Sequence, residues 1–147
     1  MAVECPAFRV RQASRVLAKR FDDEFAPFGL LSSQLPILAA TAMFGDSGAT
    51  MSRLSETLLM DRTTLTRSIR PLERAGLLQV ARSLKDARTK VVVITRAGER
   101  RIEAIFPVWE RVLKQIKESV GAQPIADLHA RLDQVIALAP VVERADE

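Results

Sequence analysis

The chain has 147 residues, of which 48% are hydrophobic and 27% are charged, and its net charge is +4. This composition is ordinary for a globular protein, and we expect residues 1–147 to form a single domain. The longest apolar runs, such as Val91 to Ile94, are far shorter than the roughly 20 residues that span a bilayer. The single Cys5 excludes an intramolecular disulfide, and the first residues contain no apolar stretch of signal-peptide length, so a cytoplasmic location is expected.

The charge is distributed unevenly along the chain. Residues 53–101 contain 12 basic and 5 acidic side chains, which gives this segment a net charge of +7. The rest of the chain has 10 basic and 13 acidic residues, a net charge of −3. A solvated surface would explain a basic segment, but segregation of this kind also favours a polyanionic partner.

Two helices are predicted before residue 48. Ala13, Leu17, Phe21 and Phe25 recur at four-residue spacing, which predicts a long amphipathic helix from Phe8 to Phe28. We expect Ser32 or Ser33 to cap a second helix with Pro36 in its first turn. Its apolar side is formed by Leu35, Leu38, Ala39 and Ala42.

The next segment predicts a helix-turn-helix. Thr50 is suited to cap a short helix that buries Leu54 and Leu58. Asp61 is suited to cap a second helix, which begins within three residues of the first and stops at Gly76. The buried side of this second helix is formed by Leu65, Ile69 and Leu72.

A hairpin and two further helices complete the predicted order. The segments "LLQVARS" and "KVVVIT" are typical of two short strands with a charged tip between them. Thr95 is expected to cap a long helix, which we expect to bend at Pro107. Its apolar stripe is Ile102, Ile105, Phe106, Trp109, Leu113, Ile116 and Val120. The last helix extends to Pro140 with Ile125, Leu128, Leu132, Val135, Ile136 and Ala139 as its apolar residues.

The predicted fold class is mainly α with a small β-hairpin. The order of elements is that of a winged helix-turn-helix, residues 32–95, between N- and C-terminal helices. These terminal helices, residues 8–30 and 96–147, carry more apolar surface than one short chain would bury alone, which favours dimerisation.

The second helix of the helix-turn-helix has a basic outer face. It carries arginine and threonine, which are the side chains that read guanine edges, hydroxyl partners and thymine methyls in the major groove. Arg67 is the best candidate for base reading, and no acidic residue interrupts the face before Glu73. The DNA-binding residues predicted on the two helices are Arg53, Arg62, Thr63, Thr64, Thr66, Arg67 and Arg70. A merely solvated helix surface is the alternative.

The hairpin tip supplies a second basic group. We expect Arg88 to enter the minor groove while Lys85 and Lys90 contact phosphates, because a projecting arginine suits this narrow, electronegative groove. Asp86 would orient Arg88 or a neighbouring arginine. Alternatively, Asp86 would only stiffen the turn, and the two roles are compatible.

The sequence resembles the MarR family of bacterial transcriptional regulators along nearly its whole length. The resemblance is carried by "DRTTLTRSIRPLERAGLL" at 61–78 and by "DARTKVVVIT" at 86–95, which is similar to the wing signature of that family. The resemblance implies a homodimer that binds a double-stranded, pseudo-palindromic operator and acts as a repressor. It also implies release from DNA by a small aromatic or phenolic effector.

Three positions depart from the family pattern. Pro71 lies inside the recognition helix, Leu31 stands where many relatives have a capping Thr, and Leu59 occupies a turn where Gly is common. Each departure affects the expected local geometry rather than the basic surface.

Several residues raise the question of what is sensed. Aromatic side chains that could line an effector pocket are Phe21, Phe25, Phe44, Phe106 and Trp109, although aromatics at helical spacing are more often core residues. Cys5 invites comparison with thiol-based oxidant sensors of the same family, but those use nearby tyrosines and this chain has no Tyr. A redox-sensing regulator is therefore kept as an alternative function.

Other classes of function find little support. The chain has one His and one Cys, no Gly-rich phosphate loop and no nucleophile elbow, so an enzyme is not expected. No cofactor is expected, and no cluster has the ligand spacing of a metal site. His129 is expected to be structural. A winged-helix module that binds protein remains a further alternative.

Overall fold

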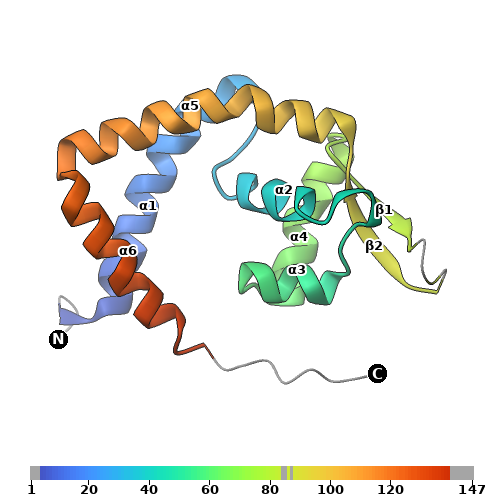
Figure 1. The fold of residues 1–147 in the computed structure, drawn as a ribbon, viewed down its shortest axis with the longest axis horizontal. Coiled ribbons are helices and arrows are strands. Elements are labelled where there is room, and N and C mark those ends of the chain that lie inside the picture. The colour runs from blue at the N-terminus through green and yellow to red at the C-terminus, as the bar shows by residue number, and fades with distance from the viewer. Residues whose placement is uncertain (1–3, 84–85, 87, 140–147) are drawn as a thin grey trace. The chain divides into compact units, whose positions relative to one another are not determined.

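The computed structural model describes residues 4–83, 86 and 88–139. Its main elements are six helices and one hairpin, shown in Figure 1. They are α1 (Pro6–Phe25), α2 (Leu35–Ala42), α3 (Met51–Leu58), α4 (Arg62–Arg74), β1 (Leu78–Arg82), β2 (Lys90–Ile94), α5 (Arg96–Val120) and α6 (Ala122–Ile136). The predicted class, mainly α with a small hairpin in a winged helix-turn-helix, is confirmed.

The chain forms two compact units, Met1–Trp109 and Glu110–Glu147. The first contains α1 to β2 and the beginning of α5, and the second contains the end of α5 and α6. The expected single domain stays a prediction. None of the described helices has the length and apolar composition needed to cross a membrane.

The helix-turn-helix forms because both of its helices are capped by their own sequence. The Thr50 side chain accepts a hydrogen bond from the Arg53 amide at the start of α3, and Asp61 accepts one from the Thr64 amide at the start of α4. At the end of α4 the Leu77 amide donates to the Leu72 carbonyl and the Gly76 amide to the Glu73 carbonyl. These two bonds, with Gly76 at φ 70°, form a Schellman motif, so all three predicted helix signals are confirmed.

The wing is a two-stranded antiparallel hairpin in which Leu78 pairs with Ile94 and Arg82 with Lys90. Ala49 adds a short bridge to β2, because its amide and carbonyl bond the Val92 carbonyl and amide at 2.9 and 2.8 Å. This bridge joins the hairpin to the segment that precedes α3. A Cβ on Gly48 would lie 2.7 Å from the Val92 carbonyl oxygen, so the bridge needs glycine there.

One core holds the first unit together. Phe25 of α1, Leu38 of α2, Leu54 of α3, Leu65 of α4 and Ile105 of α5 are all buried in it. The hairpin contributes Leu78, Val92 and Ile94. The stripe predicted for α4 is confirmed, since Leu65, Ile69 and Leu72 are its buried residues.

Thr95 connects the end of α4 to the beginning of α5. Its hydroxyl donates to the carbonyl oxygens of Gly76 and Leu77, at 2.6 and 3.2 Å, and accepts from the Gly98 amide at 3.1 Å. A Cβ on Gly98 would lie 2.3 Å from the Leu77 carbonyl oxygen, so only glycine permits this approach. The predicted cap at Thr95 is confirmed, and it also satisfies carbonyls at the end of the recognition helix.

Other helix boundaries differ from the predictions. The helix predicted at 8–28 is α1, Pro6–Phe25, followed by a short 3-10 helix at Ala26–Phe28. Neither Ser32 nor Ser33 caps α2, because that helix begins at Leu35 after Gln34 without a side-chain cap. The Ser32 amide instead donates to the Asp22 carboxylate of α1 at 2.6 Å. This tertiary bond holds the preceding turn in place of a local cap.

The apolar stripes of the last two helices are also corrected in part. Val112, absent from the predicted stripe of α5, is buried, whereas Phe106 and Val120 are more than half exposed. The last helix ends at Ile136 rather than near Pro140, so Ala139 lies outside it. The backbone stays helical across Pro107 in α5 and across Pro71 in α4.

We expect Thr95→Val to lower the free energy of unfolding by about 1–2 kcal/mol, because the hydroxyl caps α5 and satisfies carbonyls after α4. Thr95→Ser retains the hydroxyl and is the matched control. Urea denaturation of both variants at one protein concentration measures the difference. Equal stability of the Val and Ser variants would contradict the role of the hydroxyl.

Leu59 has a backbone conformation that leucine disfavours. It lies at φ 50° and ψ 40°, the only non-glycine residue with positive φ among those described. We expect Leu59→Gly to raise the free energy of unfolding by about 0.5–1 kcal/mol, since relief of the left-handed conformation exceeds the entropy that glycine adds to the unfolded chain. Glu56→Gly, in the preceding helical turn, should instead lower it by about 1 kcal/mol. Urea denaturation at one protein concentration measures both differences, and a destabilised Leu59→Gly variant would contradict the strain.

Candidate nucleic-acid interface

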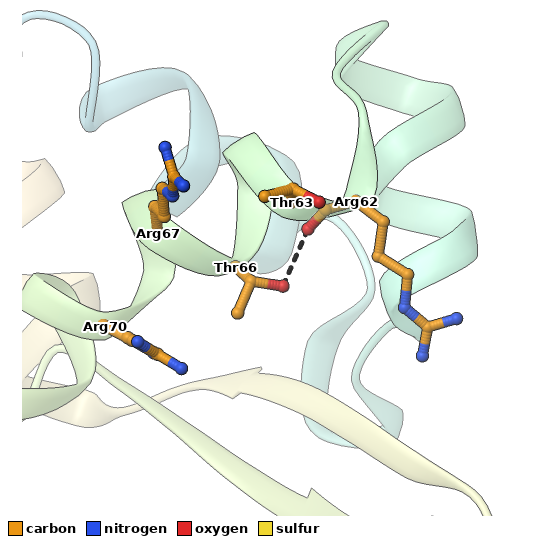
Figure 2. A pocket seen from close by; sticks show the side chains of 5 residues that line it. All are labelled: Arg62, Thr63, Thr66, Arg67 and Arg70. Carbon is orange, nitrogen blue, oxygen red and sulfur yellow. Dashed lines mark hydrogen bonds between the residues drawn. The ribbon is translucent and has the colours of Figure 1, made fainter.

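The outer face of α4 forms an open depression. Burial of Leu65, Ile69 and Leu72 turns the remaining positions of this helix toward solvent. The depression has a volume of about 360 Å³ and is lined by Arg62, Thr63, Thr66, Arg67 and Arg70 (Figure 2). The structure thus brings together five of the seven DNA-binding residues that the sequence predicted on the helix-turn-helix.

The three threonines at the beginning of α4 differ in what their hydroxyl groups do. Thr64 donates its hydroxyl proton to Asp61 at 2.6 Å, and Thr66 donates to the Arg62 carbonyl at 2.7 Å (Figure 2). Among the hydrogen bonds of the described residues, none involves the Thr63 hydroxyl. Thr63 can therefore both donate to and accept from a ligand, whereas Thr66 offers its methyl group and an oxygen lone pair.

The arginines of this face carry unneutralised charge. The guanidinium groups of Arg62, Arg67 and Arg70 point in different directions in Figure 2. Ion pairs in the described part of the chain include Lys19 with Asp23 and Lys114 with Glu118, and none of them involves an arginine of α3 or α4. An exposed arginine without an acidic partner is free to bind a phosphate or the edge of a guanine.

Arg53 lies on α3 rather than on the recognition helix. Its amide donates to the Thr50 hydroxyl at 3.2 Å, which places Arg53 in the first turn of α3 with its side chain exposed. It does not line the depression on α4, so any contact it makes with DNA would be separate from those of Arg67 and Arg70.

Asp86 organises the backbone of the wing. Its carboxylate accepts from the Arg88 amide at 2.9 Å and from the Thr89 hydroxyl at 3.0 Å. The Thr89 amide donates to the Asp86 carbonyl at 3.0 Å. These bonds stiffen the turn, and they leave the exposed Arg88 side chain out of the network. Lys90 is exposed at the start of β2, and the predicted phosphate contact Lys85 lies outside the described residues.

The aromatic residues suggested for an effector pocket do not share one environment. Phe25 is a core residue at 1% exposure, and Phe21, Phe44 and Trp109 pack against the core. Phe106 is half exposed and stacks on Trp109 with ring centroids 5.8 Å apart. Packing in or against the core accounts for four of the five without a ligand.

The other candidate sensing residues lie apart from α4 in the sequence and take no part in its face. Cys5 is a free, exposed thiol that directly precedes α1, and His129 is exposed on α6. Within the described residues, no group of three or more His, Cys, Asp or Glu side chains could hold a metal ion.

Comparisons with known proteins agree with this geometry. A family model described as the MarR family matches residues 28–89. The uncharacterized HTH-type transcriptional regulator YwoH of Bacillus subtilis is 34% identical over 97 residues, which cover 66% of this chain and 69% of YwoH. The transcriptional regulator MosR of M. tuberculosis, solved in complex with DNA, is 31% identical with a TM-score of 0.77 and covers 94% of this chain and 100% of its own. CouR from Rhodococcus jostii RHA1, bound to p-coumaroyl-CoA, shares the fold at 17% identity and a TM-score of 0.76, with 97% of this chain and 99% of CouR covered.

We expect the cap of α4 to make stability depend on pH. Hydrogen bonds from the Thr64 hydroxyl and amide lower the pKa of Asp61 from its usual 3.8. A carboxylate whose pKa is lower in the folded state contributes stability at neutral pH and loses that contribution as the pH falls through its folded pKa. Asp61→Ala should therefore lower Tm at pH 7, and its difference from the unsubstituted protein should shrink as the pH falls below 3.8.

The control for this measurement is Asp46→Ala, which removes an exposed carboxylate that caps no long helix. It should change Tm little at pH 7. A Tm difference for Asp61→Ala that stays constant down to low pH would contradict a contribution from the ionised carboxylate.

Proposed function

Since this chain belongs to the MarR family of transcriptional regulators, we propose that it is a repressor that binds a pseudo-palindromic operator as a homodimer. It is a DNA-binding regulator and not an enzyme, as are the relatives that it matches. The observation that carries the proposal is the outer face of α4, where exposed arginines without acidic partners surround Thr63 and Thr66.

In the proposed complex α4 lies in the major groove. Arg67 would bond a guanine edge, with Arg62 and Arg70 on either side of it and the threonines near the base edges. Thr64 would support this arrangement by its bonds to Asp61, more than by reading bases, because its hydroxyl proton is already engaged. Arg53 of α3 would contact the phosphate backbone.

In the same complex the wing would reach the neighbouring minor groove. Arg88 would enter the groove, since its backbone is held by Asp86 while its guanidinium is exposed. Lys85 and Lys90 would bind phosphates. Insertion without sequence reading would add affinity and a preference for narrow grooves.

We propose that the helices within residues 8–30 and 96–147 form the homodimer. Exposed apolar side chains on α1, α5 and α6 support this role, among them Val16 at 69%, Phe106 at 51% and Leu128 at 44% exposure. Exposed apolar residues on three helices favour a protein partner, and a second copy would place two α4 helices on two half-sites.

A small aromatic or phenolic effector that releases the protein from DNA completes the proposal. The binding of p-coumaroyl-CoA by CouR, which shares the fold, supports a ligand of this chemistry. Phe106 is the aromatic candidate best placed to meet such a ligand, because its half-exposed ring already stacks on Trp109.

We expect binding to genomic DNA selected in vitro to depend steeply on salt. Six or more phosphate contacts per dimer give a slope of log affinity against log salt near −5 or steeper, at roughly 0.9 per phosphate. Fluorescence anisotropy at four salt concentrations measures the slope. A flat dependence would favour the alternative of a protein-binding module.

Two variants separate base reading from charge in the same assay. Arg67→Ala should relax the base preference at one position of each half-site, at about 1–3 kcal/mol per contact. Lys90→Ala should weaken binding to all sequences alike and reduce the slope by about 1 per protomer. Arg100→Ala, which removes an exposed arginine of α5, should leave base preference unchanged.

A further inference from the structure

Leu59 is an apolar side chain whose position the fold does not explain. It is 60% exposed, whereas Leu58 and Met60 on either side pack against the core. The left-handed backbone at Leu59 makes this alternation possible, with the Met60 amide donating to the Ser55 carbonyl at 3.0 Å. Glycine would form the same turn with less strain, so the leucine side chain gives the fold nothing that glycine would not.

The location of Leu59 suggests what it meets. It lies in the turn that joins α3 to α4 (Figure 1), two residues before the cap Asp61 and three before Arg62. Arg62 and Thr63 lie together at the beginning of α4 and line its outer face (Figure 2). The exposed isobutyl group thus continues a polar and basic surface at the end where the recognition helix begins.

The chemistry of the major groove offers one apolar partner to such a group. Base edges there present hydrogen-bond donors and acceptors, and the C5-methyl group of thymine is the apolar feature among them. We propose that Leu59 is a specificity-determining residue that contacts a thymine methyl group in each operator half-site, an inference that rests on the proposed function. The left-handed backbone is retained with leucine because it presents this side chain to DNA.

The inference predicts opposite effects on stability and on binding. Leu59→Gly should fold at least as stably as the unsubstituted chain, yet bind the selected operator about tenfold more weakly, a factor in the range for loss of one base contact. Leu59→Ala, which keeps the Cβ and loses the isobutyl group, should also bind more weakly. Leu31→Ala removes a leucine of similar exposure, 52%, from the turn before α2 and should bind as before.

The partner is identified by replacing each operator thymine in turn with deoxyuridine, which lacks only the methyl group. At one position of each half-site this change should weaken binding of the unsubstituted protein by about the same factor, and it should not weaken binding of Leu59→Gly further. Anisotropy titrations of both proteins on both duplexes give the four affinities needed.

Different failures have different meanings in this design. Equal operator affinity of Leu59→Gly and the unsubstituted protein would overturn the inference while leaving the proposed function intact. A weakened variant combined with no thymine at which the methyl matters would also overturn it, since the contact would then be with sugar or with protein. Absence of DNA binding by the unsubstituted protein would overturn the proposed function itself.

Discussion

The arrangement of the DNA-binding surface depends on the junction at which α4, the wing and α5 meet. After the Schellman motif ends α4, the carbonyl oxygens of Gly76 and Leu77 accept bonds from the Thr95 hydroxyl, and Gly98 lets the first turn of α5 approach the Leu77 carbonyl. The strands lie between these two anchored points, since β1 begins at Leu78 and β2 ends at Ile94. The junction therefore fixes the end of the recognition helix and the base of the wing together, and a movement at the start of α5 has a direct path to both.

Chemically, the same helix both holds its own structure and presents its ligand-binding groups. Asp61 and Thr64 close the first turn by two hydrogen bonds, and Thr66 bonds back to the Arg62 carbonyl. These are the local bonds by which Ser, Thr and Asp usually compete with a helix, and here they occur at its start, where amide donors lack partners. What remains for DNA is narrower than the composition of the face suggests: the arginines, Thr63 and the methyl group of Thr66. Pro71 lies beyond this turn, and the helix continues through it to Arg74.

Much of this organisation could be predicted from the sequence because its signals are local. Thr50, Asp61, Gly76 and Thr95 act through bonds within a few residues, so their spacing was enough to find the two recognition elements and the start of α5. The failures are tertiary. Ser32 has the composition of a cap, but its amide is taken by Asp22 ten residues away. The second anchor of the long α5 likewise reaches far in sequence, since the Arg101 guanidinium donates to the Phe28 carbonyl. Side-chain competition also escaped prediction: nothing in the spacing distinguishes Thr63 from Thr64. Leu59 was recognised as unusual for its turn, but its left-handed backbone and outward side chain needed coordinates.

The wing changes the question that its sequence raises about Asp86. Turn stiffening and orientation of Arg88 looked like alternatives because both were imagined as side-chain pairing. In the structure Asp86 bonds the Arg88 amide and the Thr89 hydroxyl, so it fixes where the Arg88 side chain leaves the backbone and spends no charge on the guanidinium. A direct ion pair would have to break when Arg88 met DNA, whereas a bond to its amide can persist in the complex. Holding the turn before binding lowers the entropy cost of ordering it afterwards. The two roles therefore reduce to one: stiffening the turn is the means by which Asp86 orients an arginine that keeps its full charge for the groove.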